Sequence, residues 1–160
     1  MSEAFFPGSF DPPTLGHLNI IQRAAKLYNN FHVVIASNPS KKSLFSPQKR
    51  YELLVELTKP YPNVTVHIWN DLIVSFAKKH NISLMIRGVR ALADFEYEFE
   101  LAMTNKLLYP ELEILFMPTD PKYFVLRSSA IKEIALFGGK IETMVPNLVA
   151  KAIIDEMKKQ

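Results

Sequence analysis

A short segment near the start of the chain, residues 7–17 (PGSFDPPTLGH), has residue types that suit phosphate binding. It lies between a brief apolar run, residues 4–6, and a helical pattern, and open α/β proteins bind phosphates where a strand turns sharply into a helix. Gly8 allows a close approach between the backbone and a ligand. Thr14 is suited to cap the helix, which predicts His17 at the third helical position, beside any anion held by the first free N–H groups.

Lysine, arginine and hydroxyl side chains follow three further apolar runs, at the points where strands are expected to end. They occur in Ser37-Asn38-Pro39-Ser40-Lys41-Lys42, in Arg87-Gly88-Val89-Arg90 and in Arg127-Ser128-Ser129. Guanidinium groups bind phosphate through planar, bidentate contacts, so these residue types suit a polyphosphate ligand. The alternative interpretation of the RGVR sequence is a solvated strand exit. No segment has the spacing of a Ser-His-Asp triad or of a metal site.

Acidic residues are frequent in the helical pattern from about residue 91 to residue 108. Asp94 and Glu98 are four residues apart, as are Glu96 and Glu100, and like charges at this spacing destabilise a helix by roughly a few tenths of a kcal/mol. The helix dipole accounts for Asp94 and Glu96, which belong to the first turn. It accounts less well for Glu98, which is therefore predicted to face arginines or a ligand.

The other histidines are not expected to do chemistry. His32 and His67 lie in strand patterns, and His80 lies at the end of a helical pattern, where a histidine suits the helix dipole. We therefore expect all three to be structural. We also expect Trp69 and the many phenylalanines to lie in the core rather than to form stacking platforms.

Strand and helix patterns alternate along the chain, and this alternation predicts the fold. Strands are expected at residues 4–6, 31–36, 64–68, 82–86 and 113–117, and helices at residues 15–28, 46–59, 70–80, 91–108, 128–137 and 146–159. Continuous apolar runs are typical of parallel strands buried on both faces. The expected fold is an α/β protein with a Rossmann-like, doubly wound, five-stranded parallel sheet, as a single domain over residues 1–160. The carboxyl ends of such strands share one edge, so the residues above should meet there.

Composition narrows the class of protein. The chain has 160 residues and no cysteine, which excludes disulfides and thiolate metal sites and suits a reducing cytoplasm. No apolar run approaches the roughly 20 residues of a membrane span, and no signal peptide is evident. The net charge of +3 is spread along the chain, so it fits a small anionic ligand as well as a nucleic acid. We expect a cytoplasmic protein that binds neither membrane nor nucleic acid.

Seven segments together resemble one enzyme family. The first contains Thr14-Leu15-Gly16-His17, which is similar to the (T/H)xGH signature of the nucleotidylyltransferase superfamily. With SNPSKK, FSPQKR, NDLIVSFA, IRGVRALADFEYE, NKLLYPELE and LRSSAIKE, in this order and over nearly the whole chain, the sequence resembles the phosphopantetheine adenylyltransferase family. The IRGVRALADFEYE block is much more specific than the (T/H)xGH element.

The resemblance implies an activity and its ligands. Members of this family transfer the adenylyl group of ATP to phosphopantetheine, giving dephospho-coenzyme A and pyrophosphate during coenzyme A synthesis. Mg²⁺ is carried with ATP, coenzyme A binds as a feedback ligand, and the family forms homohexamers. The transfer is expected to be a direct in-line attack on the α-phosphate, without a covalent enzyme intermediate. Because the attacking phosphate is already an anion near neutral pH, no general base is needed.

The resemblance also implies roles for individual residues. His17, Lys41 and Arg90 are implied in catalysis, with His17 as the stabiliser of the transition state. ATP contacts are implied for Ser9, Phe10, His17, Gly88, Val89, Arg90, Glu98, Tyr123, Phe124, Val125, Leu126, Arg127, Ser128 and Ser129. Contacts with phosphopantetheine are implied for Ser9, Lys41, Leu72, Ile73 and Arg87, and no residue is implied as a metal ligand. The sequence departs from the family pattern where Ser9 replaces the commoner threonine and where Arg127 begins what is usually a run of three serines.

Three other functions remain as alternatives. A related nucleotidylyltransferase would act on nicotinate mononucleotide or use CTP, and the RGVR and DFEYE sequences argue against it. A nucleotide- or nucleic-acid-binding module without catalysis has only the basic pI, about 9.0, in its favour. An interaction domain built on an inactive enzyme disagrees with the presence of His17, Lys41, Arg87 and Arg90.

Overall fold

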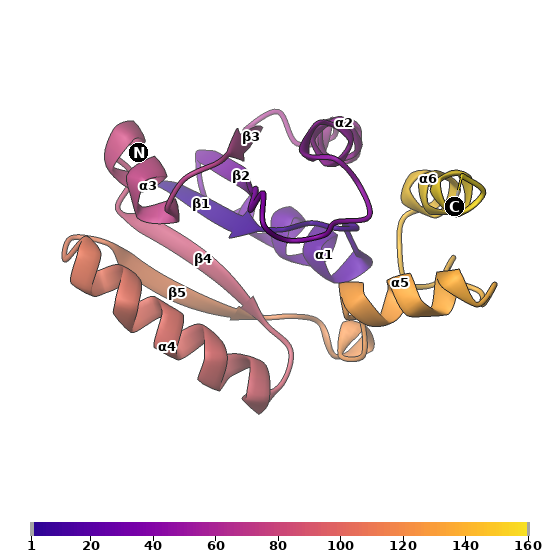
Figure 1. Ribbon diagram of the computed structural model, residues 1–160. Coiled ribbons are helices and arrows are strands. Elements are labelled where there is room, and N and C mark those ends of the chain that lie inside the picture. The colour runs from indigo at the N-terminus through magenta and orange to yellow at the C-terminus, as the bar shows by residue number, and fades with distance from the viewer. Residues whose placement is uncertain (1, 160) are drawn as a thin grey trace.

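The computed structural model describes residues 2–159 and contains a five-stranded sheet with the strand order β3-β2-β1-β4-β5 (Figure 1). The strands are β1 (Glu3–Gly8), β2 (Asn30–Ala36), β3 (Val64–Trp69), β4 (Leu84–Val89) and β5 (Glu113–Pro118), and all neighbours pair in parallel. The expected doubly wound parallel sheet is thus confirmed. The two ends of the expected domain, Met1 and Gln160, lie outside the described residues.

The helices cover both faces of the sheet. They are α1 (Leu15–Ala24), α2 (Pro47–Thr58), α3 (Ile73–His80), α4 (Leu92–Leu108), α5 (Ser128–Leu136) and α6 (Asn147–Met157), with a 3-10 turn, η1 (Pro121–Tyr123), before α5. α1 and α2 lie on one face, α3 and α4 lie on the other, and α5 and α6 extend beyond the sheet (Figure 1). The chain leaves β1 toward β2 and later returns to pair β4 with β1, so the strand order reverses at β1 and β4. Ligands bind at such a point in open α/β sheets.

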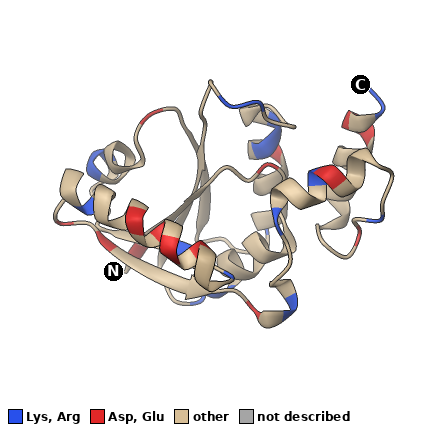
Figure 2. Ribbon diagram, turned by 60° about the horizontal axis from the view of Figure 1, so that its bottom comes forward, with Lys and Arg blue, Asp and Glu red and all other residues tan. Residues whose placement is uncertain are grey.

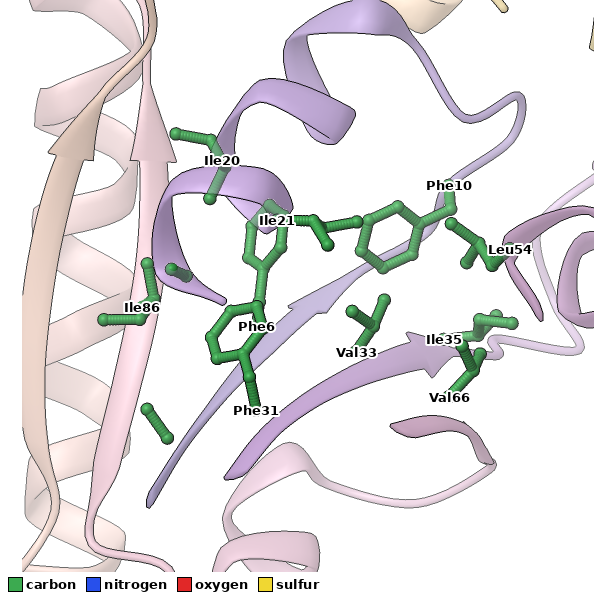
Figure 3. Close-up of a cluster of buried hydrophobic side chains, with 12 residues drawn as sticks. Phe6, Phe10, Ile20, Ile21, Phe31, Val33, Ile35, Leu54, Val66 and Ile86 are labelled. Carbon is green, nitrogen blue, oxygen red and sulfur yellow. The ribbon is translucent and has the colours of Figure 1, made fainter. Parts of the chain in front are cut away.

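Apolar side chains fix these layers. On the face covered by α1 and α2, Phe6, Ile20 and Ile86 belong to one fully or almost fully buried cluster (Figure 3). Phe10 reaches the same cluster from the loop after β1, so this loop is held against the sheet (Figure 3). A second cluster packs α3 on the opposite face, and a third joins α2 to α5 and α6.

Several boundaries differ from expectation, and two of them show how contacts from distant parts of the chain decide where an element begins or ends. β4 begins at Leu84 rather than at residue 82 and extends to Val89, since residues 87–89 still pair with β5. Arg87 therefore lies inside a strand, and the expectation that it follows the strand was wrong. α1 ends at Ala24 rather than at residue 28, and Asn63 donates hydrogen bonds of 2.8 Å to the carbonyls of Ala25 and Tyr28 as the chain turns toward β2. In residues 2–159, no helix is both long and apolar enough to cross a membrane.

Candidate active site

Two cavities with a common wall lie at the carboxyl edge of the sheet. Cavity A has a volume of about 570 Å³ and is lined by residues that include His17, Arg90 and Ser128. Cavity B has a volume of about 760 Å³ and is lined by residues that include Lys41 and Leu72. Both cavities are lined by Pro7, Gly8, Ser9, Arg87, Tyr97 and Glu98. The arrangement offers two binding spaces that meet at the end of β1.

Most of the residues singled out in the sequence meet at these cavities. Cavity A is lined by the predicted ATP contacts Ser9, His17, Gly88, Arg90, Glu98, Leu126, Arg127, Ser128 and Ser129. Cavity B is lined by all the predicted phosphopantetheine contacts, namely Ser9, Lys41, Leu72, Ile73 and Arg87. The remaining predicted ATP contacts, Phe10, Val89, Tyr123, Phe124 and Val125, line neither cavity.

His17 is held by a capping box at the start of α1. Thr14 is the N-cap, its Oγ1 accepts a hydrogen bond from the backbone N–H of His17 at 3.2 Å, and its own backbone N–H donates to Nδ1 of His17 at 3.0 Å. The predicted cap and the third helical position are therefore confirmed. A backbone N–H can only donate, so Nδ1 must be unprotonated and a neutral ring carries its proton on Nε2.

The environment of His17 keeps the ring neutral. Burial is the main cause that lowers the pKa of His17 to about 4, and the positive charges of Arg90 and Arg87 contribute to this shift in the same direction. At neutral pH the imidazole is therefore an uncharged donor, with Nε2–H available to a ligand in cavity A. Such a group can stabilise charge that develops on a phosphate, and it is poorly suited to remain protonated as an acid.

Phe10 orients the histidine rather than lining a cavity. Its backbone has a φ of 48°, in the left-handed region that a bulky residue rarely adopts and that costs about 1–3 kcal/mol. Its ring is fully buried, with the centroid 4.9 Å from that of His17 and 5.4 Å from that of Phe6. Because the side chain is buried, only the backbone of Phe10 is left for the predicted contact with a nucleotide.

Both arginines of the RGVR sequence are engaged by carboxylates of α4. Arg87 donates to Glu98 from Nε at 2.5 Å and from Nη2 at 2.6 Å, and also to the carbonyl of Pro7 at 2.8 Å. Arg90 donates to Asp94 from Nε at 3.0 Å and from Nη2 at 3.2 Å, and also to the carbonyl of Leu126 at 2.6 Å. Glu98 thus faces an arginine as its position in the helix predicted. The guanidinium groups are held in fixed orientations at the cavities.

Two buried charged residues stabilise the site through hydrogen bonds. Sequence reasoning did not single them out. Arg50, in the FSPQKR segment, donates to the carbonyl of Ser9 at 2.8 Å. Asp11 accepts hydrogen bonds from the backbone N–H groups of Leu44 and Phe45, at 2.8 and 2.9 Å, and from Lys132 at 3.2 Å. These partners are 33 to 121 residues apart in the chain, so no local pattern could have identified them.

The donor set of the site does not form a metal centre of its own. Among the residues that the structure describes, no group of three or more His, Cys, Asp or Glu side chains is arranged to hold a metal ion. The two carboxylates of cavity A, Asp94 and Glu98, are both occupied by arginines. A divalent cation would therefore have to be held mainly by oxygen atoms of a ligand, as is usual for Mg²⁺ with phosphates.

Comparisons with known proteins agree with this fold and define the family. Residues 5–134 match the family described as cytidylyltransferase-like. A solved structure from Vibrio parahaemolyticus, provisionally named a nicotinate-nucleotide adenylyltransferase, aligns over 100% of this chain and 97% of its own with a TM-score of 0.71. At 18% sequence identity this likeness shows the fold alone. The chain is thus a nucleotidyltransferase of the cytidylyltransferase-like class.

Closer relatives define the family within that class. A phosphopantetheine adenylyltransferase of Caldanaerobacter subterraneus subsp. tengcongensis is 49% identical, with 99% of both chains aligned. Phosphopantetheine adenylyltransferases of Dictyoglomus thermophilum and Clostridium tetani are 48% and 47% identical, covering 98% and 96% of this chain and 95% and 96% of their own. The chain belongs to the phosphopantetheine adenylyltransferase family, as the sequence segments predicted.

Proposed function

We propose that the protein transfers the adenylyl group of ATP to phosphopantetheine, releasing pyrophosphate and giving dephospho-coenzyme A. The observation that carries this proposal is the pair of cavities that share a wall at Ser9 and Arg87. Cavity A, with its arginines and hydroxyls, suits the nucleotide. Cavity B suits phosphopantetheine, because Lys41 and Arg87 can bind its phosphate while Leu72 and Ile73 line the space for its arm.

The shared wall brings the two reacting groups together. A phosphate oxygen of phosphopantetheine attacks the α-phosphorus of ATP, a new O–P bond forms, and the bond between the α-phosphorus and the bridging oxygen breaks, so that pyrophosphate leaves. The attacking oxygen is already an anion, so the step requires no proton transfer. The protein contributes by positioning the reactants and stabilising charge.

Each predicted residue then has a definite task in this step. His17 donates Nε2–H to an oxygen of the reacting phosphate, and its neutral state prevents an extra charge beside the arginines. Arg90 binds the phosphates of ATP from the end of β4, and Lys41 binds the phosphate of the second substrate. The hydroxyl of Ser9 lies at the shared wall, where it can contact either substrate. Mg²⁺ enters with ATP as part of the substrate.

Pyrophosphate release tests the proposal directly. Purified protein is supplied with ATP and Mg²⁺ and, in separate reactions, with phosphopantetheine or nicotinate mononucleotide. We expect pyrophosphate release only in the reaction that contains phosphopantetheine. Release with the mononucleotide alone would overturn the substrate while leaving the class of reaction intact, and release with neither would overturn the enzymatic function.

We further propose that copies of the chain assemble into a homohexamer through α4. In this helix Ala102 is the buried residue, whereas large apolar side chains are exposed at Leu92, Phe95, Tyr97, Phe99, Leu101, Met103, Leu107 and Leu108. Monomeric proteins rarely leave so many neighbouring apolar side chains in water. Light scattering should give six times the chain mass of 18.3 kDa, and a monomer at micromolar concentration would contradict the assembly.

The remaining ligands and the location follow from the same function. Dephospho-coenzyme A and coenzyme A would occupy the same two cavities, and the synthesis of coenzyme A would place the protein in the cytoplasm. Figure 2 shows lysines and arginines scattered over several elements and acidic bands on α4, a distribution that does not favour a nucleic-acid or membrane partner.

A further inference from the structure

The buried carboxylate of Asp11 joins segments that belong to both cavities. Asp11 is only 5% exposed, and both of its carboxylate oxygens accept hydrogen bonds. The donors are the backbone N–H groups of Leu44 and Phe45 and Nζ of Lys132, at 2.8, 2.9 and 3.2 Å. Asp11 and Lys132 line neither cavity A nor cavity B, so an effect of this ion pair on a substrate has to pass through other residues.

The segment between β2 and α2 contains Lys41, which lines cavity B. Within the described residues 2–159, the two bonds to Asp11 are the only hydrogen bonds that join residues 38–45 to other parts of the chain. The ring of Phe45 is buried in the cluster that joins α2 to α5 and α6. The carboxylate of Asp11 therefore fixes the backbone shortly after Lys41, and with it the approach of this lysine to cavity B.

The start of α5 belongs to cavity A, because Ser128 and Ser129 line this cavity from the first turn of the helix. Lys132 is four residues after Ser128, so the two side chains project from the same side of α5. Both reach the loop after β1: Lys132 contacts Asp11, and the hydroxyl of Ser128 donates to the carbonyl of Pro12 at 3.1 Å. α5 extends beyond the sheet (Figure 1), so these two bonds set its orientation toward cavity A.

The loop that carries Asp11 is itself held in place. Ser9 lies in the wall shared by the cavities, and its carbonyl accepts a hydrogen bond of 2.8 Å from Arg50, which is buried. The ring of Phe10 is fully buried in the core. Asp11 is therefore a fixed point to which the Lys41 segment and α5 are both attached.

We propose that Asp11 and Lys132 are positioning residues for the adenylyl transfer. Asp11 sets the place of Lys41 in cavity B, and its ion pair with Lys132 sets the start of α5 in cavity A. The inference rests on the proposed function of the two cavities. Two substrates react in line only when both are held in a narrow range of distance and angle, and a misplacement of about 1 Å can cost on the order of a hundredfold in rate. One carboxylate thus fixes the separation of the segments that hold the two substrates.

Steady-state kinetics with three variants tests the two attachments separately. Lys132→Met removes the ion pair but keeps the bonds of Asp11 to Leu44 and Phe45, so the KM for ATP should rise roughly tenfold while the KM for phosphopantetheine stays at the wild-type value. Lys132→Arg keeps the charge and should restore the KM for ATP. Asp11→Asn loses the charge and one of its two acceptor oxygens, so both KM values should rise.

Two further variants control for stability. Lys59→Met removes a lysine from an exposed ion pair with Glu56, outside both cavities, and should leave both KM values unchanged. The double variant Asp11→Asn/Lys132→Met leaves no unpaired charge, and it decides the role of Asp11 if Asp11→Asn alone does not fold. The double variant should also raise both KM values. A purely structural role would reduce the folded fraction, measured by urea unfolding, without separating the two substrates.

The inference is overturned if Lys132→Met keeps the wild-type KM for ATP or raises both KM values equally. It is also overturned if the loss of Asp11 affects a single substrate. Calorimetric titration with ATP and Mg²⁺, and separately with phosphopantetheine, repeats the comparison without turnover. If wild-type protein releases no pyrophosphate but Lys132→Met weakens ATP binding alone, the proposed function fails and the positioning of α5 by Lys132 stands.

Discussion

Two histidines of this protein have the same lowered pKa in very different surroundings. The pKa of His17 and that of His67 are both lowered to about 4, in each case mainly by burial. The secondary cause is a pair of arginines, Arg90 and Arg87, for the first histidine. For the second it is a pair of other histidines, His32 and His80.

The two surroundings differ in whether they leave the histidine ring available to a ligand. Nε2 of His67 is 2.9 Å from Nδ1 of His32, whose Nε2 is 2.8 Å from a carboxylate oxygen of Glu3, and His80 lies against His67 with ring centroids 5.5 Å apart. These side chains contact one another and line neither cavity. His17 uses only Nδ1 internally and lines cavity A. A shifted pKa therefore does not identify a functional histidine here, whereas an unused donor at the carboxyl edge of the sheet does.

The strongest test of this difference compares His17→Ala with His67→Gln. Loss of one preorganised donor in a reacting site costs on the order of a hundredfold in kcat. We expect His17→Ala to lose at least that much, and His67→Gln to keep kcat within about twofold of wild type, by the same principle. Pyrophosphate release at saturating substrates measures both values. A loss of similar size in the two variants would show that the histidine cluster also supports the reaction.

A second test uses the arginine neighbours that only His17 has. Arg87→Ala removes a guanidinium from the wall shared by the cavities, so the KM for phosphopantetheine should rise roughly tenfold to a hundredfold. Because Arg87 lowers the pKa of His17, the same variant should raise that pKa from about 4 toward its ordinary value and leave His67 unchanged. Titration of the histidine resonances by NMR measures both. An unchanged phosphopantetheine KM would remove Arg87 from the second substrate's site.

The contrast between the two regions also shows what the sequence could predict. The helix cap at Thr14 and the place of His17 were predictable, because a cap and its third residue are neighbours in the chain. The pairing of Arg90 with Asp94 could have been inferred too, since the two are four residues apart at the start of a helix. The structural role of the other histidines was expected, but the contact between His32 and His67 depends on how β2 and β3 pair.

The features that sequence reasoning missed depend on contacts across the fold. Arg50 appeared to have no functional role, yet it holds the carbonyl of Ser9 from a helix 41 residues away. Arg87 was expected in a loop, and its pairing with Phe116 on β5 places it in a strand instead. The ring of Phe10 lies in the core, as expected for the phenylalanines, but no local pattern predicted the left-handed backbone at this position. None of these contacts leaves a periodic or compositional signal.

The free energy of unfolding in acid should reveal the lowered pKa that His17 and His67 share. The pKa of each is about 4 in the folded state and near 6.5 when unfolded, so the unfolded chain binds more protons between these values. The contribution of each neutral ring is present above pH 6.5 and is lost as the pH falls to about 4. We expect urea unfolding to show a smaller loss of stability over this range in His67→Gln than in wild type. His17→Gln should show the same change, although it alone loses activity. If both variants kept the wild-type pH dependence of the free energy of unfolding, this would contradict the neutral state of the two rings in the folded protein.

The smallest expected effect separates the cap of α1 from the chemistry of His17. Thr14→Ala removes the oxygen that accepts the N–H of His17, which should lower the free energy of unfolding by about 1 kcal/mol. The backbone N–H of residue 14 still donates to Nδ1, so the tautomer of His17 is kept and kcat should fall only a few-fold. Ser46→Ala is the matched control, because Ser46 caps α2 in the same way and lines neither cavity. It should lose similar stability and no activity. A loss of kcat in Thr14→Ala as large as in His17→Ala would mean that the hydroxyl of Thr14, rather than its backbone, sets the state of the imidazole.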